Sequence, residues 1–183
     1  MIFLDKDGTL IDNVPYNVDP ERIALAAGAV EGLRMLAAAG FRVAVVSNQS
    51  GVARGYFPET ALTDVEKCVR RLLAEIGVPL AGFFYCPHHP KGTVPRYARA
   101  CECRKPAPGM LLTAARQLKV ELPACWMVGD LLDDVEAGRR AGCRTILIDN
   151  GNETEWQMGP YREPEFRAPD LAEAARLITK DRI

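Results

Sequence analysis

Two aspartates, Asp5 and Asp7, stand directly after an apolar run at residues 1–4, and Gly8 follows them. This order predicts a buried strand that ends in two carboxylates and a turn. Carboxylates are costly to remove from water unless a cation or a reaction uses them. Ligands in open α/β sheets bind at the carboxyl ends of the strands, so this pair indicates either a chemical site or a polar turn, and the polar residues that end later runs, together with Lys105, favour the site.

Polar residues also end two later apolar runs. Ser47 and Asn48 follow a β-branched run, and Asp130 follows another run and a glycine. Parallel strands would place these ends beside Asp5, and carboxylates gathered there would repel one another strongly. A divalent cation removes that repulsion. Oxygen ligands with room for water suit Mg²⁺, which usually completes its shell with water and a substrate phosphate.

A second group of possible ligands has the spacing of a zinc site. Three of the six cysteines lie near the only two histidines, in the pattern Cys86-x-His88, twelve residues, then Cys101-x-Cys103. Four such ligands favour tetrahedral zinc, and with no position left for water the zinc would be structural. His89 is the alternative to His88. Disulfides are the competing interpretation, but they require an oxidising, secreted context.

The elements that would position these residues alternate along the chain. Strands are expected at residues 1–5, 41–47, 83–86, 125–128 and 145–148. Helices are expected at residues 29–39, 59–76, 109–119, 132–141 and 171–179. Residues 87–107 show no periodicity, and residues 150–169 are expected to form a surface excursion of unknown purpose. This alternation predicts parallel β-α-β units in a three-layer, Rossmann-like α/β sandwich.

Bulk composition limits the classes of function. The chain has 183 residues, 48% of them apolar and 26% charged, with a net charge of −1. These values predict one domain over residues 1–183 and argue against nucleic acid as a partner. No apolar run approaches the roughly 18 residues of a membrane helix. The four apolar residues before Asp5 are too few for a secretory signal, so a cytoplasmic location is expected. The protein is also expected to be a monomer.

Four segments together resemble the four motifs of the haloacid dehalogenase superfamily of phosphatases, in the order typical of that family. They are residues 5–9, 46–49, 105–106 and 129–134. The resemblance extends over residues 1–150 and implies Mg²⁺-dependent hydrolysis of a phosphomonoester through an aspartyl phosphate. No insertion is long enough for the large cap domain that some members of the family carry.

The resemblance implies a role for each motif residue. Asp5 would be the nucleophile, while Lys105 and Mg²⁺ would offset the charge of the phosphate. Asp7 would protonate the leaving alkoxide and then deprotonate the hydrolytic water, which requires a raised pKa. Ser47 and Asn48 would hydrogen-bond the phosphoryl oxygens.

The fourth motif would complete the Mg²⁺ site. The resemblance implies that Asp130 binds Mg²⁺ together with Asp5 and the backbone carbonyl of Asp7. Asp134 lies four residues after Asp130, one helical turn away, and is preferred over Asp133 as the supporting acid.

The loop at residues 86–103 narrows the resemblance to a zinc-loop subgroup of the family, whose members act on a heptose bisphosphate or on histidinol phosphate. The resemblance carries substrate contacts over to Asn13, Val14, Pro15, Tyr16, Ser47, Asn48, Gln49, Ser50, Arg104 and Lys105. A zinc-stabilised loop would hold Arg104 and Lys105 in place. Leu131 follows Asp130 where some relatives have a lysine, which puts a substrate contact there in doubt.

Charge offers a weak test between the two substrates. A second phosphate favours arginines, and Arg96, Arg99 and Arg104 could supply them. The ammonium of histidinol phosphate favours a carboxylate, which Asp12 or Glu102 could supply. The arginines favour the bisphosphate. A zinc-loop interaction module without catalysis is the remaining alternative, and the intact acidic and lysine motifs argue against it.

Overall fold

The computed structural model describes residues 1–181. In this part of the chain six strands form one parallel sheet in the order β3-β2-β1-β4-β5-β6. The strands are β1 (Ile2–Leu4), β2 (Val43–Asn48), β3 (Leu80–Cys86), β4 (Trp126–Gly129), β5 (Arg144–Ile148) and β6 (Phe166–Ala168). The expected parallel sheet is confirmed.

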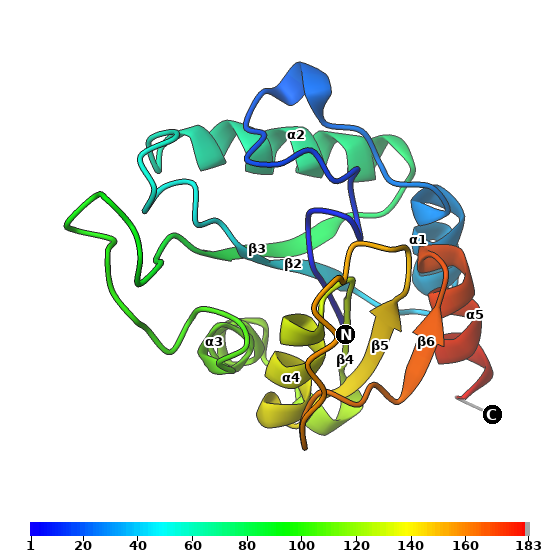
Figure 1. The fold of residues 1–183 in the computed structure, drawn as a ribbon. Helices are drawn as coiled ribbons and strands as arrows, with labels where there is room; N and C mark the ends of the chain where they lie inside the picture. Colours follow the sequence, from blue (N-terminus) through cyan, green and yellow to red (C-terminus); the bar gives the residue numbers. More distant parts are fainter. Residues whose placement is uncertain (182–183) are drawn as a thin grey trace.

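Helices cover both faces of the sheet, which gives three layers (Figure 1). One face carries α1 (Ala29–Ala38), α2 (Ala61–Glu75) and α5 (Leu171–Lys180). The other carries α3 (Gly109–Leu118) and α4 (Leu132–Ala141). Two short 3₁₀ helices, at Pro20–Arg22 and Leu122–Ala124, lie in connections. Within residues 1–181, every helix is too short or too polar to cross a bilayer.

The core follows from the alternation of side chains along the central strand. Ile2 and Leu4 of β1 pack toward α1, α2 and α5, whereas Phe3 packs toward α3 and α4. All three side chains are fully buried. A parallel strand covered on both faces is apolar along most of its length, so polar residues gather toward its end.

The register of the sheet brings three of these polar ends together. Leu4 of β1 pairs with Val45 of β2 and with Val128 of β4. Asp5 and Asp130 directly follow their strands and Ser47 is the penultimate residue of β2, so the three residues line one cleft at the same edge of the sheet, as predicted.

A glycine is required where the chain turns away from this edge. Gly8 has a φ of +81°, in the left-handed region that favours glycine. A Cβ there would lie 2.3 Å from a carboxylate oxygen of Asp130. The turn after β1 therefore depends on glycine both for its conformation and for space against the acidic site.

The structure corrects the boundaries of two expected segments. Strand β3 begins at Leu80, three residues earlier than expected, and α2 is shorter at its start. The segment at residues 150–169 is not a simple surface excursion, because Phe166–Ala168 forms β6 at the edge of the sheet. The sequence signal there is weak, since only three residues pair and Arg167 between them is exposed.

Candidate active site

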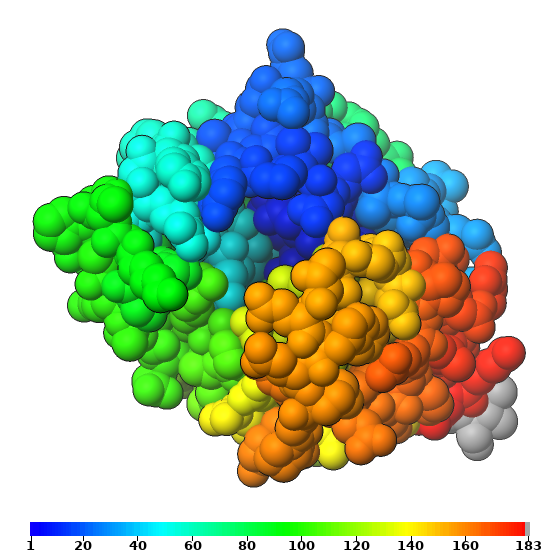
Figure 2. All heavy atoms as spheres, in the orientation of Figure 1, coloured from blue at the N-terminus to red at the C-terminus, as the bar shows by residue number. Residues whose placement is uncertain are grey.

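A cleft of about 290 Å³ lies at the edge of the sheet where β1, β2 and β4 end. It is lined by the predicted residues Asp5, Asp7, Asn13, Ser47, Asn48, Lys105 and Asp130, together with Asp134 and Asn152. Figure 2 looks into this hollow, with the dark-blue start of the chain at its floor, the blue N-terminal loop above it and the orange segment beside it. The structure thus brings the residues of all four sequence motifs to one cleft.

Lys105 forms the centre of a buried ionic group. Its Nζ lies 2.5 Å from Oδ1 of Asp5 and 2.6 Å from Oδ1 of Asp134, and it donates to the carbonyl of Val46 at 2.9 Å. Burial alone would lower the pKa of Lys105, but the carboxylates of Asp134 and Asp5 raise it above its usual value. Lys105 is therefore a fixed ammonium group at the floor of the cleft.

The side chain of Asn48 places this lysine. Its Oδ1 accepts from the backbone N–H of Lys105 at 3.0 Å, and its Nδ2 donates to the carbonyl of Lys105 at 2.9 Å. The two bonds join the end of β2 to the loop that carries Lys105. In this structure the Asn48 amide positions Lys105, although sequence reasoning assigned it only to the substrate.

The two acids paired with Lys105, Asp5 and Asp134, lie close to a third, Asp130, and we call the three the carboxylate cluster. Each offers an oxygen within 4.8 Å of the others. Burial raises the pKa of Asp130, and repulsion from Asp5 and Asp134 raises it further. One lysine cannot balance three acids, so the cluster fits a divalent cation with oxygen ligands.

The structure distinguishes between the two neighbouring acids of α4. Asp134 is buried against Lys105, and its Oδ2 accepts from the backbone N–H of Leu131 at 3.1 Å. Asp133 also lines the cleft, but its Oδ1 accepts a hydrogen bond from Arg162 at 2.7 Å. The placement matches the preference for Asp134 as the supporting acid.

Asp7 lies above the carboxylate cluster, and its side chain is 31% exposed. Burial raises the pKa of Asp7, as does repulsion from Asp5, while the Lys6 ammonium opposes both. Lys6 lies 2.5 Å from Oδ1 of Asp7, and Gln49 donates to Oδ2 at 3.2 Å. The raised pKa suits a group that must hold a proton before it can donate one.

Ser47 and Gln49 form a pair next to Asp7. Both side chains are buried, and Nε2 of Gln49 donates to Oγ of Ser47 at 2.8 Å. Because the same nitrogen also contacts Asp7, Gln49 links the end of β2 to the candidate acid. The structure therefore gives Gln49 an internal contact in addition to the predicted place beside the substrate.

A smaller cavity of about 240 Å³ adjoins the cleft and shares Asp7, Asn13 and Asn48 with it. Five further predicted substrate contacts line it, namely Val14, Pro15, Tyr16, Gln49 and Ser50. Tyr16 has a φ of 55°, which is unusual for a bulky side chain. Its ring packs edge-on against the ring of Tyr56, with 4.7 Å between the ring centroids. Most of this lining is uncharged, so the cavity is suited to the body of a sugar better than to a second phosphate.

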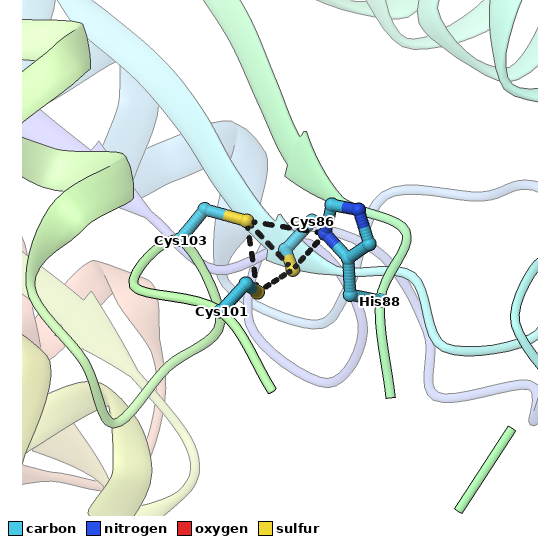
Figure 3. A group of neighbouring side chains, drawn as sticks. All are labelled: Cys86, His88, Cys101 and Cys103. Atoms are coloured by element: carbon cyan, nitrogen blue, oxygen red, sulfur yellow. Dashed lines mark hydrogen bonds between the residues drawn. The ribbon is translucent and has the colours of Figure 1, made fainter. Parts of the chain in front are cut away.

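Cys86, His88, Cys101 and Cys103 converge at one point, as Figure 3 shows, and we call them the thiol cluster. Neighbouring ligand atoms are 3.0–3.6 Å apart. A disulfide bond measures about 2.05 Å, whereas sulfurs on one tetrahedral zinc are about 3.7 Å apart. The spacing therefore fits a single tetrahedral ion.

The orientation of the two histidines agrees with the preferred ligand. Nδ1 of His88 faces the sulfurs of Cys86 and Cys103. His89 turns away, and its Nδ1 accepts from the backbone N–H of Lys91 at 3.0 Å. Hydrogen bonding between Cys86 and Cys103 lowers the pKa of the Cys103 thiol and raises that of Cys86, so Cys103 is the thiol of this pair that more readily becomes the thiolate that a metal requires.

The three loop arginines do not share one location. Arg104 lines a cavity of about 370 Å³ that meets the catalytic cleft at Lys105 and Asp133. Arg96 and Arg99 line another cavity, which shares no residue with the cleft. Arg99 contacts Nε2 of His88 at 2.9 Å. Of the three arginines expected to receive a second phosphate, only Arg104 therefore lies in a cavity that meets the cleft, and a contact from Arg96 or Arg99 stays a prediction.

Sequence reasoning missed three residues that contact the site. Lys6 is buried against Asp7, Thr9 donates to Oδ1 of Asp130 at 3.2 Å, and Asn152 donates to its Oδ2 at 2.8 Å. Lys6 and Thr9 stand inside the first motif and could have been noticed there. Asn152 carries no such signal, because it lies far along the chain in an aperiodic segment.

Comparisons with known proteins agree with this fold. A HAD-hydrolase-like family model matches residues 102–174. A D-glycero-beta-D-manno-heptose-1,7-bisphosphate 7-phosphatase from Yersinia pestis is 40% identical over 151 residues, which cover 82% of this chain and 80% of the relative. A phosphatase of the same name from Pasteurella multocida is 41% identical over 151 residues, with 82% of each chain covered.

A solved structure also matches almost the whole chain. The D,D-heptose 1,7-bisphosphate phosphatase from B. bronchiseptica, complexed with magnesium and phosphate, has a TM-score of 0.84 and 32% identity, and the match covers 98% of both chains. The chain belongs to the haloacid dehalogenase-like hydrolases. Within that family, the relatives described above are phosphatases that are named for a heptose bisphosphate.

Proposed function

We propose that this protein removes the 7-phosphate of a D-glycero-D-manno-heptose 1,7-bisphosphate in a Mg²⁺-dependent reaction. The observation that carries the chemistry is the convergence of Asp5, Asp7, Lys105 and Asp130 on one cleft. The choice of sugar is supported by the relatives, which are about 40% identical and carry that substrate in their names.

In the first half of the reaction, Asp5 attacks phosphorus. A bond forms between its carboxylate oxygen and phosphorus as the bond to the sugar oxygen breaks. Lys105 holds Oδ1 of Asp5 at 2.5 Å, which leaves the second oxygen of that carboxylate for the attack. Asp7, whose pKa is raised, donates its proton to the departing alkoxide.

In the second half, water replaces the enzyme carboxylate on phosphorus. Asp7 is now ionised and takes a proton from the water, which attacks phosphorus and releases Asp5. Ser47 and Asn48 line the same cleft and would hydrogen-bond the oxygens of the phosphoryl group. Both halves use the same residues, so the enzyme returns to its starting state.

The carboxylate cluster would hold Mg²⁺, with Asp5 and Asp130 as side-chain ligands and the backbone carbonyl of Asp7 as a third. Bound Mg²⁺ would offset the charge that otherwise opposes attack by a carboxylate on a phosphate. Asp134 is paired with Lys105, so it would support the lysine rather than the cation.

The thiol cluster would hold a structural zinc ion. All four ligands come from the protein, so no position is left for a reactive water. Cys103 is two residues before Lys105, and a fixed Cys103 would therefore fix the path of the chain into the cleft. A charged sugar phosphate does not cross membranes readily, which supports the cytoplasm as the place of action.

A panel of phosphate-release assays tests this function. The panel compares the α and β anomers of heptose 1,7-bisphosphate, fructose 1,6-bisphosphate and histidinol phosphate in the presence of Mg²⁺. We expect the highest kcat/KM with a heptose bisphosphate, and the product should retain its 1-phosphate. A higher kcat/KM with histidinol phosphate would reject the proposed substrate while keeping the phosphatase chemistry.

A further inference from the structure

Residues 150–153 follow β5 and connect the orange segment of Figure 1 to the active site. Three side chains of this stretch make the connection. Asn150 donates to the carbonyl of Gly8 at 2.7 Å, Asn152 donates to Oδ2 of Asp130 at 2.8 Å, and Glu153 accepts from the backbone N–H of Leu132 at 2.7 Å. The stretch thus joins the turn after β1 to the start of α4, on both sides of Asp130.

The contact to Asp130 differs in kind from the contacts of the other two acids. Asp5 and Asp134 both pair with the ammonium of Lys105. Within the described residues, the side chains that hydrogen-bond to Asp130 are uncharged: Thr9 donates to Oδ1 and Asn152 to Oδ2. Two donors, one on each oxygen, fix the plane of the carboxylate without cancelling its charge.

Steric fit supports this arrangement independently. A Cβ at Gly8 would lie 2.4 Å from Nδ2 of Asn152 and 2.3 Å from Oδ2 of Asp130. The two groups are therefore packed directly against the backbone of the turn after β1. Asn152 also lines the catalytic cleft itself, so its amide is at the site and not behind it.

We propose that Asn152 is a positioning residue for the metal site, because its amide holds Asp130 in the orientation that a divalent cation requires. Mg²⁺ demands near-octahedral ligand geometry, and neighbours that orient a ligand typically change metal affinity by about 10- to 100-fold. A lysine or arginine could also fix Asp130, but it would offset the charge that attracts the cation. The inference rests on the proposed Mg²⁺ site and adds a residue to it.

Calorimetric titration with MgCl₂ tests the role directly, without substrate. We expect Asn152→Ala to raise the Kd for Mg²⁺ by about tenfold or more relative to wild type. Asn152→Leu keeps the branched shape of the side chain but has no donor, and it should show the same loss. The matched control is Glu153→Gln, which changes the neighbouring anchor, keeps an acceptor for Leu132 and does not contact Asp130. Its Kd should stay within twofold.

The activity of the variants provides a second readout. At saturating Mg²⁺, kcat of Asn152→Ala should return to within a fewfold of wild type, because the reacting groups remain. A Kd for Mg²⁺ that stays within twofold in both Asn152 variants would overturn the proposal, as would an equal loss in Glu153→Gln. If wild type itself bound no Mg²⁺, the metal site of the proposed function would fail first, so the two failures are distinguishable.

Discussion

The carboxylate cluster and the thiol cluster are both groups of potential metal ligands, but they are built on different principles. The carboxylates come from the residues that directly follow β1 and β4 and from the first turn of α4, whereas the thiol cluster comes from residues 86–103. The first group lines an open cleft. The second offers four protein ligands around one point.

The electrostatic balance of the two clusters differs as well. The carboxylate cluster has three acids for one buried lysine, and burial raises the pKa values of Asp130 and Asp134. In the thiol cluster, hydrogen bonds with the neighbouring side chains, above all with Cys86, lower the pKa of Cys103 below its ordinary value. An unbalanced charge beside open space indicates chemistry, whereas a closed set of ligands indicates a structural role.

The largest expected effect is the loss of the nucleophile. Asp5→Asn should reduce turnover on the order of 10⁴-fold or more, because the amide cannot attack phosphorus. The exposed Asp149, which faces Arg167 at 3.8 Å, offers a matched control in Asp149→Asn with turnover close to wild type. Steady-state phosphate release measures both variants. Turnover of Asp5→Asn within tenfold of wild type would contradict the nucleophile assignment.

Disruption of the thiol cluster should act indirectly and more weakly. Cys101→Ser removes one soft ligand, and we expect loss of bound zinc and a fall in activity of about tenfold as the loop before Lys105 loosens. Metal analysis and limited proteolysis of residues 86–103 check this result. Cys143→Ser, at a cysteine outside the thiol cluster, is the control for thiol loss. Full zinc content in Cys101→Ser would refute the ligand set.

Removal of one acid should stabilise the fold while it harms catalysis. The pKa of Asp130 is higher in the folded protein than in the unfolded chain, where an aspartate has a pKa of about 3.9. Ionisation of Asp130 therefore destabilises the folded protein once the pH rises above that unfolded-state pKa. Asp130→Asn should therefore raise Tm by roughly 2–4 °C at pH 8 without added Mg²⁺, the shift that about 1 kcal/mol produces in a domain of this size. The gain should disappear near pH 4. A lower Tm at pH 8 would show that Asp130 contributes net stability.

The smallest effect concerns the proton on Asp7. The Lys6 ammonium lowers the pKa of Asp7, so Lys6→Gln should raise that pKa further. Asp7 would then stay protonated to higher pH, and the descending limb of the kcat/KM profile should move upward in pH. Lys6→Arg keeps the charge and should keep the wild-type profile. A downward movement in Lys6→Gln would contradict the acid role of Asp7.

The fold was largely predictable because its signals are local and repetitive. Apolar runs and helical periods located β1, β2 and β4, and the parallel order of the sheet then placed Asp5, Ser47 and Asp130 together. Strand β6 was missed because it has three residues in a segment rich in proline and charge. Strand β6 forms because it pairs with β5, and its own sequence gives no clear strand signal.

The residues of the candidate site also differ in how far local sequence signals predict them. The four ligands of the thiol cluster are recognisable from spacing, and Asp134 from its helical offset to Asp130. The placement of Arg96 and Arg99 could not be predicted, because an aperiodic loop gives no direction to its side chains. Asn152 was missed for a related reason: only the folded chain brings it to Asp130.

The most direct test of the difference between the two clusters is a metal-dependence experiment on the wild-type enzyme. The protein is dialysed free of loosely bound ions, its metal content is measured by plasma mass spectrometry, and phosphate release from heptose 1,7-bisphosphate is then followed with added Mg²⁺ or Zn²⁺. We predict about one zinc per chain retained, no turnover without addition, and full turnover restored by Mg²⁺ alone. Zinc-free protein that is fully active with Mg²⁺, or activity restored by Zn²⁺ and not by Mg²⁺, would contradict the separate roles of the carboxylate and thiol clusters.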